Sequence, residues 1–216
     1  MDKIKKIAKK YNLKIIEDVA EAIGAKINKK LCGTFGDVSC FSFFSNKIIT
    51  TGEGGMLLIK SNLLANEAFR IRDYGKVSKN GRIFHKLPAL SNGRLSEFSA
   101  AIVSVFLDNY NDILRKRERI YKLYNSLIPE CLIYQYRNKF DQEISFYKYI
   151  TYLKSSKYKV SGVYDSDNQL YSILKENNIK FKFIGDNPFG VKHLCLPFFS
   201  SMNDSDVKNV VNNIEI

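Results

Sequence analysis

Three residues in the first quarter of this 216-residue chain have types and spacing that could support chemistry. Asp18 ends an apolar run that predicts a buried strand, although an acid there often serves only to cap a helix. Ser42 lies in an alternating segment, and Lys47 follows it five residues later, where a lone lysine is usually a solvated loop residue. The glycines at 52, 54 and 55 then indicate a turn with positive φ. Each signal is weak alone, so their order carries the interpretation.

Taken in order, these residues have the layout of a pyridoxal 5'-phosphate (PLP) site. Lys47 would form a Schiff base with the cofactor aldehyde and then carry a proton between the two reacting carbons. Asp18 would pair with the pyridine nitrogen and keep it protonated, so that the ring acts as an electron sink. The hydroxyl of Ser42 could bond the phosphate. PLP is therefore the predicted cofactor.

The same segments resemble the DegT/DnrJ family of PLP-dependent sugar aminotransferases. The resemblance rests on IIEDVAEAIGA at 15–25, SNKIITTGEGG at 45–55, NGRLSEFSAAI at 92–102 and LCLPFFSSMNDSDVKNVVNNI at 194–214. It implies an α/β chain with the PLP-dependent transferase fold type I, which is aspartate aminotransferase-like. The expected parts are a partial large domain on a mostly parallel sheet and a small C-terminal α/β domain.

The resemblance also implies roles for matched residues. Lys47 corresponds to the Schiff-base lysine, and the family's dehydratase branch has histidine there, so transamination is favoured. Asp18 corresponds to the partner of the pyridinium, Ala20 to the small residue beneath the ring, and Ser42 to the phosphate-binding serine.

Two further matches precede a predicted helix. Asn92 corresponds to the asparagine that reaches the phosphate across a dimer interface, and Arg94 is a candidate for binding a substrate carboxylate. The implied reaction moves an amino group, usually from glutamate, to a nucleotide-linked keto-sugar. The implied assembly is a homodimer with its active sites at the interface.

Glu21 departs from the family pattern, which usually has Gln donating a hydrogen bond to the 3'-oxygen of PLP. An ionised Glu cannot donate, and it would place negative charge beside that oxygen. Glu21 could be protonated, could point elsewhere, or could leave the cofactor held less well. A solvent-facing residue that has drifted harmlessly is the plainer alternative.

Length is the larger departure, because family members are about twice as long. We expect the first part of the large domain to be missing, including several strands of its sheet, which would expose a sheet edge and apolar faces. The chain could be half of a split enzyme completed by an N-terminal polypeptide, or a cut-down relative that still dimerises and holds PLP weakly. It could also be a non-catalytic homologue that acts as an assembly subunit or remnant.

The elements expected to position these residues alternate between strand and helix. A helix is predicted at 1–11, strands at 13–16, 38–44 and 56–59, and a helix at 61–73; long helices follow from Ser96 and Asn111, then a strand at 146–153, a helix near 166–177, a strand at 179–184 and a helix from Asp204. We place the partial PLP-binding domain at 1–108, and the linking helix with the small domain at 109–216.

Composition limits the remaining classes of function. The net charge is +12, from 34 Lys+Arg against 22 Asp+Glu. The lysines are scattered rather than gathered in a stripe, which favours a generally cationic surface over nucleic-acid binding. No apolar run approaches the ~20 residues that span a bilayer, and the charged N-terminus does not resemble a signal peptide. The four cysteines form no C-x-x-C pair and the two histidines lie far apart, so we predict a cytoplasmic protein without a metal site.

Overall fold

The computed structural model describes residues 1–89, 92–129, 142–152 and 193–212. These residues form two compact units. The first unit contains Met1–Leu114 and a later segment that ends at Tyr147. The second unit contains the part of the chain that begins at Arg115 and precedes this later segment, and the part that begins at Lys148. The predicted domain boundary at 108/109 stays a prediction.

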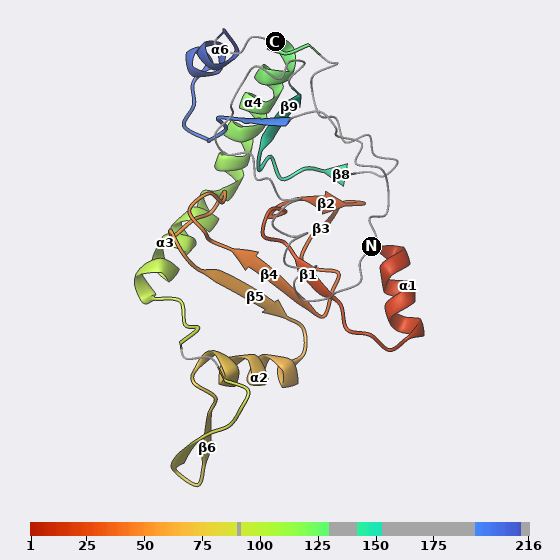
Figure 1. Ribbon diagram of the computed structural model, residues 1–216, viewed down its shortest axis with the longest axis vertical. Coiled ribbons are helices and arrows are strands. Elements are labelled where there is room, and N and C mark those ends of the chain that lie inside the picture. Colours follow the sequence, from red (N-terminus) through yellow and green to blue (C-terminus); the bar gives the residue numbers. More distant parts are fainter. Residues whose placement is uncertain (90–91, 130–141, 153–192, 213–216) are drawn as a thin grey trace, which may run out of the picture. The chain divides into compact units, whose positions relative to one another are not determined.

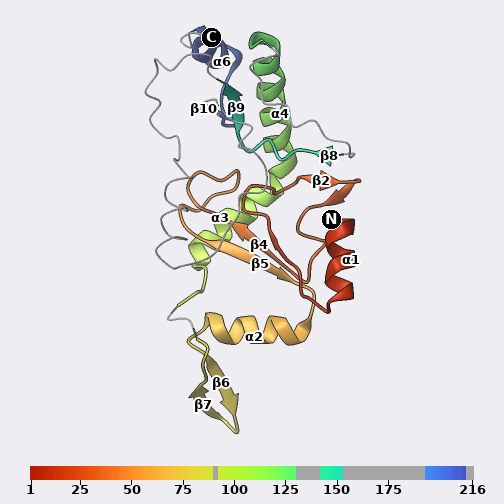
Figure 2. The same cartoon turned by 45° about the vertical axis from the view of Figure 1, so that its right-hand side comes forward.

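Unit 1 contains most of the regular elements (Figure 1). In chain order they are α1 (Asp2–Lys10), β1 (Ile16–Asp18), β2 (Lys26–Ile27), β3 (Lys30–Leu31), β4 (Val38–Ser42), β5 (Gly55–Ile59), α2 (Asn62–Arg72), β6 (Lys76–Lys79), β7 (Arg82–His85), α3 (Glu97–Asp108), the start of α4 (Tyr110–Leu127) and β8 (Gln142–Glu143). Figure 2 shows β6 and β7 as a hairpin that extends away from α2. The Asn80–Gly81 pair, both with positive φ, makes its tight turn.

A three-stranded sheet in the order β1-β4-β5 is the frame of unit 1. β1 runs parallel to β4, with Asp18 opposite Cys40, and β5 runs antiparallel to β4. The reversal into β5 requires glycine at Gly55, because a Cβ there would lie 2.7 Å from the carbonyl oxygen of Phe41. Backbone pairing therefore brings the carboxyl ends of β1 and β4 to the same edge of the sheet.

Helix α3 covers the core beside the glycine-rich turn. Its N-cap is Ser96, whose hydroxyl accepts a hydrogen bond from the N–H of Ser99 at 3.1 Å. Val103, on this helix, packs in one buried cluster with Phe43 and Ile49. These contacts hold the chain on both sides of Lys47 in place.

Unit 2 is built on the remainder of α4, with β9 (Tyr149–Tyr152), β10 (His193–Leu196) and α6 (Asp204–Asn212). β9 and β10 pair antiparallel. Its buried core contains the following residues: Ile120, Tyr124, Ile128, Tyr149, Leu196, Met202 and Val207. The buried hydroxyls have partners, since Tyr124 donates to the carbonyl of Pro197 at 2.8 Å and Tyr149 to Oδ1 of Asn125 at 2.9 Å.

The first strand corrects a sequence prediction. A buried strand was expected at 13–16, whereas β1 begins at Ile16. Ile16 is 69% exposed and Leu13 57% exposed. β1 is an edge strand of the described sheet, so the apolar run that predicted burial lies mostly before it and in the open. β10 was not among the predicted strands. The helix near 166–177 and the strand at 179–184 lie outside the described residues.

No helix in the described ranges is both long enough and apolar enough to cross a membrane.

Candidate active site

The carboxylate of Asp18 stands at the carboxyl end of β1. Its Oδ1 accepts a hydrogen bond from the N–H of Ala20 at 3.0 Å, which fixes the turn after the strand. Among the described residues, its second oxygen has no hydrogen-bond partner. Asp18 therefore combines a structural bond with a carboxylate oxygen that can receive a cationic N–H.

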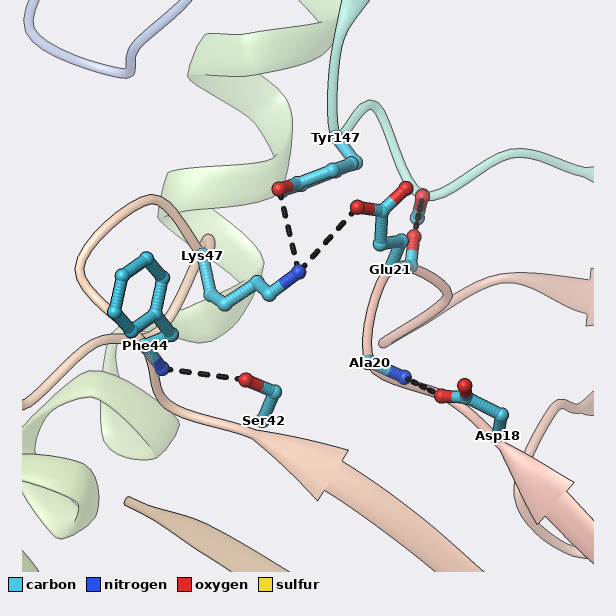
Figure 3. Close-up of polar contacts among 8 residues, drawn as sticks. Asp18, Ala20, Glu21, Ser42, Phe44, Lys47 and Tyr147 are labelled. Carbon is cyan, nitrogen blue, oxygen red and sulfur yellow. Dashed lines mark hydrogen bonds and ion pairs between the residues drawn. The ribbon is translucent and has the colours of Figure 1, made fainter. Parts of the chain in front are cut away.

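Ser42 ends the neighbouring strand. Asp18 pairs with Cys40, and alternation along β4 then places Ser42 on the same face two residues further on. The Ser42 hydroxyl accepts a hydrogen bond from the N–H of Phe44 at 3.3 Å (Figure 3). This bond leaves the hydroxyl proton available for an acceptor such as a phosphate oxygen.

Lys47 is held by the turn that follows β4. The backbone N–H of Lys47 donates to the carbonyl of Phe44 at 3.0 Å, and the next two residues, Ile48 and Ile49, are buried. The N–H of Thr51 returns to the carbonyl of Phe43 at 3.0 Å, which closes the loop. With both isoleucines anchored in the core, the lysine side chain is directed into the site, where only 14% of it is exposed.

The Lys47 amine contacts two oxygen-bearing side chains (Figure 3). Its Nζ is 3.4 Å from Oε1 of Glu21 and 3.4 Å from the hydroxyl of Tyr147. Burial by itself would lower the pKa of Lys47. The hydrogen bond with Tyr147 and the negative charge of Glu21 outweigh burial, so the pKa of Lys47 is raised above its ordinary value.

Glu21 points at the lysine, although its own side chain is 55% exposed. The position where the resemblance implies a Gln thus carries a counterion for Lys47. Ala20, directly before it, lies in the turn after β1 and donates its N–H to Asp18. The structure brings Asp18, Ala20, Glu21, Ser42 and Lys47 together around the ends of β1 and β4.

Asn92 and Arg94 lie before α3, and their contacts are with another part of unit 1. Oδ1 of Asn92 accepts the N–H of Arg94 at 3.1 Å. The Arg94 guanidinium forms an ion pair with Asp73 and lies 5.3 Å from the ring centre of Tyr74. These contacts fix the loop before α3 without placing either side chain against Lys47.

Tyr147 is a site residue that sequence reasoning did not identify. It fell inside the strand predicted at 146–153, where an aromatic residue is expected to pack rather than to bind. It is 9% exposed, and one hundred residues separate it from Lys47. A contact across that separation has no periodic signal in a single sequence.

Comparison with known proteins gives the class. Residues 1–191 match the DegT/DnrJ/EryC1/StrS aminotransferase family. The chain belongs to that family.

Curated relatives include GDP-perosamine synthase of Vibrio cholerae, which is 30% identical over 229 residues. That match covers 98% of this chain and 61% of the relative, so the chain spans less than two thirds of the relative's length. The GDP-perosamine synthase of Escherichia coli O157:H7 is 38% identical over 132 residues, covering 59% of this chain and 36% of the relative.

Solved structures agree in fold. Helicobacter pylori PseC, described as an aminotransferase involved in the biosynthesis of pseudoaminic acid, matches with a TM-score of 0.77 at 21% identity. The match covers 98% of this chain and 61% of that one. The PLP form of the Streptococcus pneumoniae sugar aminotransferase Spr1654 matches with a TM-score of 0.71 at 21% identity. That match covers 95% of this chain and 58% of the other. The predicted fold type I architecture, with a partial large domain, is confirmed. The described strands of its sheet have one parallel pairing, β1 with β4, and one antiparallel pairing, β4 with β5, rather than the mostly parallel order expected.

Proposed function

We propose that this chain is the lysine-bearing part of a PLP-dependent aminotransferase that acts on a nucleotide-linked keto-sugar. The observation that carries the proposal is the grouping of Lys47, Asp18 and Ser42 at the carboxyl ends of two neighbouring strands. An amine, a carboxylate with an oxygen to spare and a hydroxyl are the groups that an aldehyde, a pyridine nitrogen and a phosphate require.

Each residue then has a defined task. Lys47 holds the cofactor through its amine and carries a proton at Nζ. Asp18 supplies negative charge at the ring nitrogen, and Ala20 leaves room beneath the ring. Ser42 donates its hydroxyl to the phosphate. When bound, PLP supplies an electron sink that stabilises negative charge on the carbon that carries the amino group.

Asn92 and Arg94 have tasks that depend on assembly. We propose that Asn92 reaches the phosphate of a second subunit's cofactor and that Arg94 binds the carboxylate of the amino donor, for which glutamate is the candidate. The partner is a second copy in a homodimer, or a polypeptide that completes the large domain. A cytoplasmic location also stays a prediction.

The substrate class follows from the relatives' names. Curated relatives include enzymes named for GDP-, dTDP- and UDP-linked amino sugars. The nucleotide thus varies within the family, while the nucleotide-linked sugar is common to these names. We therefore propose that class of substrate without a particular nucleotide.

The test is covalent incorporation of the cofactor. The purified chain is incubated with PLP, reduced with borohydride and digested, and the modified peptide is located by mass spectrometry. We expect the label on Lys47, its loss in Lys47→Ala and its retention in the control Lys3→Ala, which alters an exposed lysine of α1. Absence of label on Lys47 at saturating PLP would refute the proposal and favour a non-catalytic role.

A further inference from the structure

The hydroxyl of Tyr147 contacts the Lys47 amine beside Glu21 (Figure 3). Both oxygens lie 3.4 Å from Nζ, at the long end of the hydrogen-bond range. The centre of the Tyr147 ring is 4.9 Å from Nζ, so the hydroxyl rather than the ring face makes the closer contact. The ammonium is thus shared between two acceptors rather than captured by one.

The segment Gln142–Tyr147 holds Tyr147 in this position. β8, at the start of the segment, pairs antiparallel with β2, and Lys26 forms an ion pair with Glu143 at 2.7 Å. Further along, the Ser145 hydroxyl donates to the carbonyl oxygen of Glu21 at 2.8 Å. Ser145 therefore joins the segment that carries Tyr147 to the backbone of Glu21.

This connection limits how Tyr147 and Glu21 can move independently. The tyrosine is almost fully buried, whereas Ser145 is half-buried and Glu21 is exposed. A buried hydroxyl in a partly desolvated site interacts more strongly with a charge than an exposed one does. The buried Tyr147 hydroxyl should therefore affect the ionisation of Lys47 more strongly than an exposed hydroxyl at the same distance would.

We propose that Tyr147 is a positioning residue for Lys47. With Glu21 it holds the ammonium group through two oxygen contacts, and Ser145 fastens the segment that carries Tyr147. The proposal rests on the proposed function, because it gives Lys47 a fixed direction from which to meet a carbonyl compound. It assigns a task to a segment that lies outside the family motifs and places Tyr147 one hundred residues after Lys47.

The test measures the ionisation of Lys47 without PLP. Lysines are methylated with formaldehyde and cyanoborohydride across the alkaline pH range, and the rate at Lys47 is read by peptide mass spectrometry. Lys26, paired with Glu143, is the internal reference. Tyr147→Phe keeps the ring and removes the hydroxyl, and Tyr11→Phe is the control at an exposed tyrosine beside Lys10.

We expect Tyr147→Phe to shift the Lys47 profile to lower pH, because the hydrogen bond with Tyr147 is one of the contacts that raise the pKa of Lys47. Labelling below the midpoint should then be about two- to fivefold faster. Ser145→Ala should shift it in the same direction by less. A profile unchanged in Tyr147→Phe would overturn the proposal. A parallel shift at Lys26 would do so too, because it would mean that Tyr147 merely stabilises the segment. If the unsubstituted chain takes up no PLP at Lys47 while the Lys47 profile shifts as expected, the proposed function is refuted and the positioning role of Tyr147 is not.

Discussion

Replacing Glu17 by Gln should destabilise unit 1 without altering any residue of the site. The carboxylate of Glu17 receives three backbone N–H groups from the loop before β4. Oε2 accepts from Gly33 at 2.8 Å, and Oε1 accepts from Phe35 at 2.6 Å and from Gly36. A Gln side chain can keep one oxygen acceptor, but its NH₂ group then faces an N–H that it cannot accept.

The magnitude follows from these contacts. Hydrogen bonds to a charged acceptor contribute about 1.5–3 kcal/mol each, and the substitution removes one and weakens two. Because Glu17 is only half-buried, we expect the lower part of that range for the whole change, about 2 kcal/mol. With a urea m-value of about 2 kcal/mol/M, the unfolding midpoint should fall by about 1 M.

Urea unfolding followed by circular dichroism measures this shift. The matched control is Glu53→Gln, which removes an exposed carboxylate in the glycine-rich turn and should change stability by less than about 0.5 kcal/mol. If Glu17→Gln also stays within about 0.5 kcal/mol, the carboxylate does not hold the loop and the reasoning is wrong.

Two predictions concern pH. The N–H of Ile15, bonded to Asp37 at 2.9 Å, lowers the pKa of that carboxyl, so its stabilising contribution is present above the ordinary carboxyl pKa and lost as pH falls through the lowered value. Asp37→Asn should flatten the acid side of the stability profile, measured by urea midpoints at several pH values, whereas Asp2→Asn should leave it unchanged. In unit 2, burial raises the pKa of Tyr124 to about 12 and that of Tyr149 further. The stability that these tyrosines contribute is present below the ordinary tyrosine pKa and is lost as pH rises through the raised values. Ultraviolet titration should therefore show a delayed phase, linked to unfolding, that Tyr149→Phe diminishes. A titration without that phase would contradict the prediction.

The sequence was most informative where a local pattern repeats. Helical periodicity located α2 and α3 to within two residues, and alternation located β4. It was uninformative for β2, β3 and β8, because strands of two residues have no period. The pairing of β2 with β8 also joins segments more than one hundred residues apart. The prediction that β1 is buried was wrong. An apolar run indicates only that a strand could be buried, whereas the sheet order shows that β1 lies at the edge of the described sheet.

The candidate site divides in the same way. Lys47, Asp18 and Ser42 lie in short motifs, so their types and order could be read locally. The contact of Glu21 with Lys47 depends on side-chain direction, and Tyr147 arrives from a distant segment. A single sequence contains no local signal for either contact.

The pairing of β1 with β4 also decides where the chain can be lengthened. Because strand pairing aligns Asp18 with Cys40, the length of the connection between the two strands does not determine the distance from Asp18 to Ser42. The turn at Asn28 and Lys29, exposed and already in positive φ, is thus a place where a reporter peptide can be inserted. One residue added inside β4 before Ser42 would instead turn its hydroxyl to the opposite face of the sheet.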